Sequence, residues 1–447
     1  MSTYTLTLYI GVDLGKSSHI AAFLSKELLE RHRRFSACPT LPVPNSSAGF
    51  NLLKEQIEKY SSPAETCVLV EHTGHYGFAL IQFLQEHGIQ VYHMQVSRRH
   101  QWDKTDVKDA QALGNLLYNT VAMGIQSSDK TQRIARLEPL PETVRKLRGL
   151  VRHRYELVSE ATQRKNKLTA ICDQLFPEFT QIYKDPNKES ALNLREKFAT
   201  ARDVAEASIH ALCATRARNL PSQANLLTLQ TLARSSIGTH DEARCYSLIL
   251  EQRQLIAELR LMSANIEELN ERIVELASAS REGQILASFD CIGPVQAGIL
   301  VSGICPISNF ETPSKLKGYV GWAPRRIQTG STIDKMVMQS NGNRMLKQAV
   351  YMVVMNALTD RESSWRLRYD RLVERKCDYD ERTGRYKGKM KVVGRIAGDL
   401  LEMMWTLLKK DYDLLQSLEP GQEPPEPELY SEEKHRKALK IALPDKV

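Results

Sequence analysis

Four acidic residues stand at positions where they could gather around metal ions. Asp13 ends one apolar segment and Glu71 ends another, and each segment is typical of a buried strand. Asp106 and Asp109 begin a helical pattern. Carboxylate oxygens are ligands that Mg²⁺ prefers, and a pair of Mg²⁺ ions held this way is suited to cutting and rejoining phosphodiesters. The spacing therefore predicts an acidic quartet that holds Mg²⁺.

The elements that must position these acids follow one another in an informative order. The patterns predict strands at 6–12, 20–25 and 33–37, a helix at 49–60, a strand at 67–71, a helix at 75–87, a strand at 89–94 and a helix at 106–117. A three-stranded antiparallel meander followed by alternating helices and strands is the ribonuclease H-like order. Asp106 and Asp109 are three residues apart, so they share one face of the final helix.

Several segments together resemble a known family. They are Gly11–Lys16, the strand ending at Glu71, Lys104–Ala110, Gly318–Ser331 and Ser340–Lys347. In these segments the chain resembles the DEDD transposases of insertion sequences, which join a RuvC-like domain to a serine transposase domain and use a bridge RNA. The resemblance runs from Tyr9 to about Leu415 and implies that the acidic quartet holds Mg²⁺.

The resemblance also implies a covalent step. The family's nucleophile is a hydroxyl in a Ser-Gly pair that attacks a DNA phosphate and forms a phosphoester. Counted from Pro324, that position falls on Thr329, whose side chain is bulkier and more restricted than serine. Ser331 is the other candidate if the loop is shifted, and impaired strand-transfer chemistry is the third alternative. Arg325 and Arg326 stand where guanidinium groups could clamp the scissile phosphate.

Residues 135–285 have a different character. Apolar residues alternate in steps of four and three over about three heptads, which indicates a coiled-coil seam; they are Leu255, Leu259, Met262, Ile266, Leu269, Ile273 and Leu276. We interpret the seam as part of an arm for dimerisation and for spanning nucleic acid, with a plain spacer as the alternative. Prolines between the two helical stretches predict a smaller insert.

Composition narrows the class of partner. The 447 residues carry a formal charge of +8, with cations clustered along the chain, and a basic surface beside acidic metal ligands suits a polyanion. No apolar run is long enough to cross a membrane and the first residues form no signal peptide, so we expect a cytoplasmic protein. The eight scattered cysteines form no CxxC pair, which argues against a zinc site.

The predicted fold class is α/β plus α. It comprises a RuvC-like ribonuclease H-like domain (1–130), a helical coiled-coil region with an insert (131–284), a mainly helical serine-type transposase domain (285–416) and a disordered tail (417–447). The residues predicted to bind nucleic acid are Lys104, Lys108, Arg325, Arg326, Arg344, Lys347 and Lys389. The resemblance implies donor and target DNA and a noncoding bridge RNA as partners, and assembly as a homodimer or tetramer.

Four other functions stay open at this point. The related Piv-type invertases share these domains, so DNA inversion is one, and a RuvC-like junction endonuclease would cut by hydrolysis without a covalent step. A domesticated RNA-binding protein is the non-enzymatic alternative, against which the intact quartet argues. Asp13 with its Gly-containing turn also occurs in actin-like kinases, but that fold gives no reason for Asp106 and Asp109.

Overall fold

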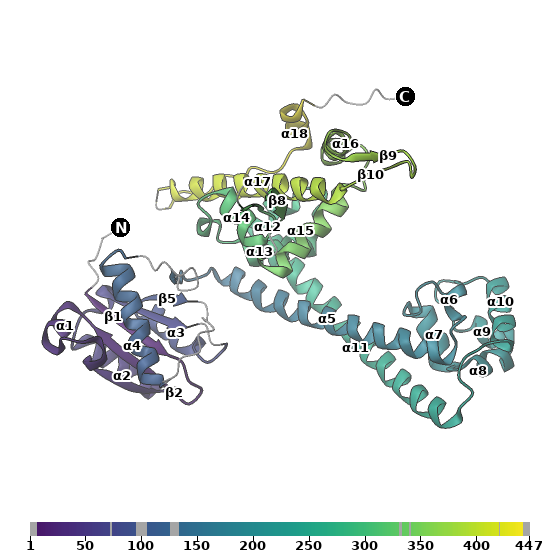
Figure 1. Ribbon diagram of the computed structural model, residues 1–447, viewed down its shortest axis with the longest axis horizontal. Coiled ribbons are helices and arrows are strands. Elements are labelled where there is room, and N and C mark those ends of the chain that lie inside the picture. Colours follow the sequence, from purple (N-terminus) through teal and green to yellow (C-terminus); the bar gives the residue numbers. More distant parts are fainter. Residues whose placement is uncertain are drawn as a thin grey trace. The chain divides into compact units, whose positions relative to one another are not determined.

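The protein divides into two compact units, Met1–Leu140 and Pro141–Val447 (Figure 1). Each unit has its own apolar core. The computed structural model describes residues 7–71, 74–94, 105–125, 134–329, 333–338, 341–419 and 421–440. The finer division expected near residue 284 stays a prediction.

The first unit is built on a six-stranded mixed sheet in the order β3-β2-β1-β4-β5-β6. Its strands are β1 (Leu8–Asp13), β2 (Ser18–Leu24), β3 (Thr40–Pro44), β4 (Thr66–Glu71), β5 (Gln90–Met94) and β6 (Ile134–Arg136). Its helices are α1 (Lys26–His32), α2 (Ser47–Glu58), α3 (Phe78–Glu86) and α4 (Asp106–Leu117). β1 runs antiparallel to β2 and parallel to β4, so the expected meander and the expected crossover both occur.

The third strand differs from the prediction. Phe35–Ala37 forms a short 3₁₀ helix, and the strand that pairs with β2 is Thr40–Pro44. Prolines at 42 and 44 lack a backbone N–H and hide the strand pattern. They are tolerated because β3 lies at the edge of the sheet.

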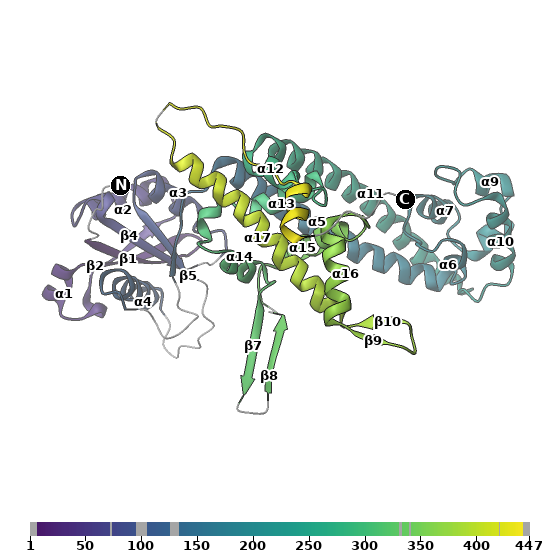
Figure 2. The ribbon, with the colours of Figure 1, turned by 90° about the horizontal axis from the view of Figure 1, so that it is seen from above.

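The second unit begins with two long helices that pair antiparallel, α5 (Glu142–Leu175) and α11 (Glu242–Ala279) (Figures 1 and 2). Arg154 Nε donates to Asn270 Oδ1 at 2.6 Å, and Arg244 Nη2 donates to Gln174 Oε1 at 2.6 Å, so early α5 meets late α11. The helices between them cluster at one end of the pair around a separate apolar core; they are α6 (Phe179–Ile182), α7 (Glu189–Lys197), α8 (Ala201–Glu206), α9 (Ile209–Cys213) and α10 (Gln223–Arg234).

The apolar seam of α11 finds its partner inside the same chain. Leu255 and Leu259 are buried with Leu168 of α5, and Ile273 is buried with Leu147 nearer the start of α5. These seam positions are therefore covered without a second chain, and dimerisation through the arm stays a prediction. The periodicity of apolar residues predicts that one face of a helix is covered, but it does not predict which helix covers it.

The rest of the second unit packs around α13, whose residues from 297 to 304 are all buried. A helix that is apolar all round belongs in a core. α13 spans Pro294–Ile304, and the other elements of this part are α12 (Arg281–Ala287), α14 (Pro313–Val320), β7 (Pro324–Thr329), β8 (Ile333–Met338), α15 (Arg344–Ala357), α16 (Ser364–Lys376), β9 (Asp378–Asp380), β10 (Arg385–Lys387) and α17 (Lys389–Gln416).

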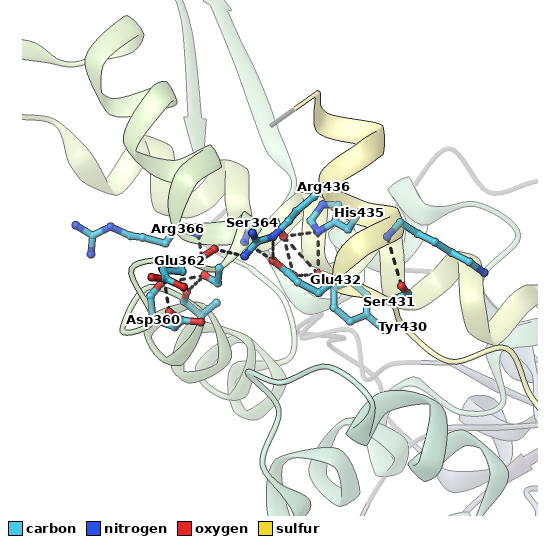
Figure 3. A network of polar contacts seen from close by, with 12 residues as sticks. Asp360, Glu362, Ser364, Arg366, Tyr430, Ser431, Glu432, His435 and Arg436 are labelled. Atoms are coloured by element: carbon cyan, nitrogen blue, oxygen red, sulfur yellow. Dashed lines mark hydrogen bonds and ion pairs between the residues drawn. The ribbon is translucent and has the colours of Figure 1, made fainter. Parts of the chain in front are cut away.

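The segment expected to be a disordered tail contains a docked helix, α18 (Glu432–Leu439). Its Glu432 carboxylate accepts hydrogen bonds from the backbone N–H and the Oγ of Ser364, from Tyr430 Oη at 2.7 Å and from Arg436 Nε at 3.0 Å (Figure 3). The Pro-rich, charged composition hides this helix, because the groups that stabilise it come from α16, far away in the sequence.

The ring of His435 completes this network. His435 is 6 % exposed, and its Nδ1 lies 2.8 Å from both Ser364 Oγ and Tyr430 Oη. Both hydroxyls donate to Glu432, so Nδ1 carries the proton and donates to the two oxygens. Burial lowers the pKa of His435, which favours the neutral form of the ring.

Candidate active site

Asp13 and Glu71 lie at the ends of neighbouring parallel strands. Gly11 of β1 pairs in register with Leu69 of β4, and the pairing continues through the next residues of both strands. Alternate residues of a strand point to the same face. Asp13 is thus on the face of Gly11, and Glu71 is on the face of Leu69. The two carboxylates share one edge and one face of the sheet.

Helix α4 lies on that same face, held by a close approach of two glycines. A Cβ added at Gly11 would lie 2.1 Å from both Ala110 O and Gly114 N, so neither backbone leaves room for a side chain there. The rings of Tyr9 and Tyr118 are also in contact, with their centroids 5.2 Å apart. Since the earlier strand residue meets the later helix residue, α4 runs antiparallel to β1. Its first turn therefore points toward the strand end that carries Asp13.

The first turn of α4 carries the other two acids. Thr105 caps the helix by accepting from Lys108 N at 3.3 Å, and Asp106 and Asp109 follow in that turn. Asp106 is exposed and Asp109 is half-buried. Carboxylates near a helix N-terminus also interact favourably with the helix dipole, so their position has a structural benefit apart from any metal.

The backbone thus brings the four acids to one edge, but their side chains do not form a closed cage. Within the described ranges, no group of three or more His, Cys, Asp or Glu side chains is arranged to hold a metal ion. Asp13, Lys108 and Asp109 each make a polar contact of their own. The donor set itself fits Mg²⁺, because all four candidates are carboxylates and Mg²⁺ is bound through one or two of them plus water and phosphate. Lys104 lies outside the described residues.

The hydroxyl candidates belong to a β-hairpin of the second unit. β7 pairs with β8 from Pro324↔Met338 to Thr329↔Ile333, so Thr329 is the last paired residue before the turn. Figure 2 shows the hairpin projecting from the helices around it. Ser331 lies in the turn, outside the described residues. Arg325 and Arg326 are both exposed on β7, on opposite faces by alternation.

The root of the hairpin is held by a second pair of glycines. Gly321 has a φ of 92° and Gly342 a φ of 138°, and a Cβ on Gly342 would lie 2.6 Å from Gly321 Cα. Asn343 then donates its backbone N–H to Tyr319 O at 2.8 Å and caps α15 through its side chain. The Gly and Gly-Asn elements of the sequence pattern therefore close the hairpin at its base.

The remaining predicted nucleic-acid contacts are spread over this unit. Lys347 is half-buried and lies over the Trp322 ring, with its Nζ 5.7 Å from the ring centroid. Arg344 and Lys389 are exposed at the first positions of α15 and α17. The sequence reasoning missed the glycine contacts, for which a glycine inside a helical pattern at 114 was the available signal.

Two family models match the chain. Residues 10–177 match the DEDD transposase model of the IS110 type, and residues 283–370 match the transposase family IS116/IS110/IS902. Together they span more than half of the chain and include all four acids and the hairpin. The chain belongs to the IS110-type transposases. The DEDD domain of this family implies a ribonuclease H-like fold, with which the mixed sheet agrees.

Two relatives are similar over most of their length. The transposase is 21% identical over 427 residues to the insertion element IS110 uncharacterized 43.6 kDa protein of Streptomyces coelicolor, covering 91% of this chain and 95% of the relative. It is 21% identical over 368 residues to the insertion element IS116 uncharacterized 44.8 kDa protein of Streptomyces clavuligerus, covering 80% and 86%. In the part of the transposase that the structure describes, no helix is long and apolar enough to span a membrane.

Proposed function

We propose that this transposase cuts and rejoins DNA strands at an active site composed of the acidic quartet and a hydroxyl of the β7–β8 hairpin. The observation that carries the proposal is the Gly11–Gly114 contact, which directs the first turn of α4 toward the strand end of Asp13. In the proposed site Asp13, Glu71, Asp106 and Asp109 hold Mg²⁺. When bound, Mg²⁺ supplies Lewis-acid stabilisation of charge on the phosphate.

In the proposed reaction the hydroxyl oxygen of Thr329, or of Ser331, attacks the scissile phosphorus. A bond forms between that oxygen and phosphorus, and the bond to one bridging oxygen of the DNA breaks. The hydroxyl proton leaves the nucleophile, and the departing DNA oxygen takes up a proton. Attack by a DNA hydroxyl on the phosphoester then releases the side chain and rejoins the strand. In the proposed site the guanidinium of Arg325 or of Arg326, which lie on opposite faces of β7, binds the non-bridging phosphate oxygens.

Family resemblance also supports a noncoding RNA that selects the DNA sites and an assembly of two or four chains. The seam on α11 gives no support for the assembly, because α5 covers it. Light scattering on the full chain with and without RNA measures the number of chains. Acids and hydroxyl belong to different units of the chain, so the proposed reaction requires both units to meet on one phosphate.

The quartet is tested with Asp106→Asn, which removes a charge and keeps the shape of the side chain. We expect strand cleavage to fall by about 10²–10³-fold or more, as when a principal source of transition-state charge stabilisation is lost. Stability should change by only about 0.3–1 kcal/mol, through the helix dipole. Cleavage of a labelled DNA substrate and calorimetric Mg²⁺ binding are the measurements. A well-folded Asp106→Asn protein with full activity would reject the quartet.

The nucleophile is tested by the protein–DNA adduct. We expect Thr329→Ala to remove the adduct, Thr329→Ser to keep or increase it, and Ser331→Ala to have the milder effect. Adduct formation is followed by denaturing gel electrophoresis of a labelled substrate. Loss with Ser331→Ala alone would assign the role to Ser331. Cleavage without an adduct in any variant would instead support a hydrolytic junction endonuclease.

A further inference from the structure

A groove whose charged side chains are all cationic except Asp399 lies between α16 and α17. A cavity of about 510 Å³ is lined by Arg368, Arg371, Arg375, Lys376 and Arg395, together with two leucines. A second cavity of about 660 Å³ shares Lys376 and Arg395 with the first. The two cavities therefore adjoin and form one groove.

The second cavity carries the groove to the base of the β7–β8 hairpin. Trp322, Pro324 and Met338 line it there, and Pro324 and Met338 are paired residues at the root of the two strands. A chain-like ligand in the groove would thus pass from α18 to the strand that ends at Thr329.

The cations of this groove differ in their carboxylate partners, and Lys317 pairs with Glu402. Arg368 Nη2 and Arg395 Nε share the single carboxylate of Asp399, at 2.6 and 3.2 Å. Arg371, Arg375 and Lys376 are exposed, and across the described parts of the chain no carboxylate forms an ion pair with them. The half-buried Lys409, outside the groove, does pair locally, with Asp413 at 2.6 Å.

The spacing of these cations is unfavourable without an anion. Arg368, Arg371 and Arg375 are three and four residues apart, so they lie on one face of α16 and repel one another. A phosphate between them removes the repulsion, and the planar guanidinium fork matches two phosphate oxygens. The helix that carries them is held in place by Glu432 at its N-terminus (Figure 3), and Leu439 of α18 lines the groove.

We propose that the α16–α17 groove binds the sugar–phosphate backbone of a nucleic-acid strand and leads it to the root of the hairpin. This proposal rests on the proposed function, in which DNA and RNA are the partners. Three of its cations, Arg371, Arg375 and Lys376, follow residue 370, where the family match ends. Arg368 and the residues at the hairpin root lie within the matched segment.

The test measures binding by the full chain in EDTA, so that no cleavage intervenes. The probes are a labelled duplex DNA and a labelled RNA strand, each of about 20 nucleotides, and their separate affinities distinguish the two sources of backbone. We expect the triple variant Arg371→Gln, Arg375→Gln and Lys376→Gln to weaken binding at least about tenfold, and to reduce the slope of log affinity against log salt by about 2–3.

Two controls make the result specific. The control variant Arg136→Gln, Lys315→Gln and Lys410→Gln also removes three positive charges, from exposed ion pairs outside the groove, and should leave affinity nearly unchanged. Arg371→Lys with Arg375→Lys keeps the charge and should retain the salt slope. Equal weakening by both triple variants, or no weakening by the groove variant, would overturn the proposal. Cleavage is measured separately in Mg²⁺, so that failure of the proposed active site and failure of the groove proposal are distinguishable.

Discussion

Both units use a pair of glycines to bring together segments that are far apart in the sequence, but the two contacts differ in kind. Gly11 and Gly114 join a central strand to a helix, and both have ordinary backbone angles, so only the lack of space demands glycine. Gly321 and Gly342 join the two ends of a projecting hairpin, and both have positive φ values. There, conformation and space both demand glycine.

The difference shows how each unit positions its chemical groups. In the first unit the acids sit on elements whose packing also forms the core, so site geometry and stability depend on one contact. In the second unit the hairpin projects from the core, and its glycines determine only where the hairpin starts. A change at the first pair should therefore affect the whole unit, whereas a change at the second pair should act locally.

The largest expected effect is that of Gly11→Ala. Its Cβ would meet the backbone of α4 at 2.1 Å, and overpacking of this kind costs about 3 kcal/mol. Hydrogen exchange of peptides from β1 and α4 in the full chain should rise together. The control Gly149→Ala, where nothing lies within 4 Å, should instead stabilise α5 by about 0.5–1 kcal/mol. If the hydrogen-exchange protection of β1 is unchanged in Gly11→Ala, the Gly11–Gly114 contact does not support the core of the first unit.

A smaller and more local effect is expected for Gly342→Ala. The φ of 138° and the approach to Gly321 should together cost about 2 kcal/mol. Exchange should rise at the hairpin root and adduct formation should fall, while β1 and α4 keep their protection. Gly318→Ala has open space around the new Cβ and serves as the control. Equal loss of protection across the second unit would show that the hairpin root is part of the core.

The smallest expected effect is a pH dependence in the docking of α18. Burial lowers the pKa of His435 below 6.5, so docked α18 binds fewer protons than free α18. Its docking is fully stable above about pH 6.5 and weakens as the pH falls from there toward the lowered pKa. The groups around the ring are the hydroxyls of Ser364 and Tyr430, the carboxylates of Glu432 and Asp399, the guanidinium of Arg368 and the indole of Trp365.

Exchange of residues 429–440 should accordingly be faster at about pH 5.5 than at about pH 7.5, after correction for the intrinsic rate. His435→Asn keeps a donor near the position of Nδ1 but cannot titrate in this range, so it should flatten the difference. A pH response that persists in His435→Asn would assign the titration to another group.

The sequence by itself determined the elements that carry the acids. Asp106–Leu117 is the helix that the pattern predicts, and the strands that end at Asp13 and Glu71 lie side by side as the order of elements requires. These features follow from local periodicity and from the short list of ways in which strands and helices connect. The acids could be found because strand ends and helix starts are local signals.

Only the tertiary structure decided what covers each face. The apolar pattern of the α11 seam predicts a coiled coil whether its partner helix lies in the same chain or in a second chain. In the folded protein α5 of the same chain covers the seam. The strand at 40–44 is allowed its prolines by its place at the edge of the sheet, and α18 is stable because Ser364 supplies its partners. Each of these features depends on contacts between residues far apart in the chain. The energies of such contacts cannot be inferred from the local pattern of apolar and polar residues.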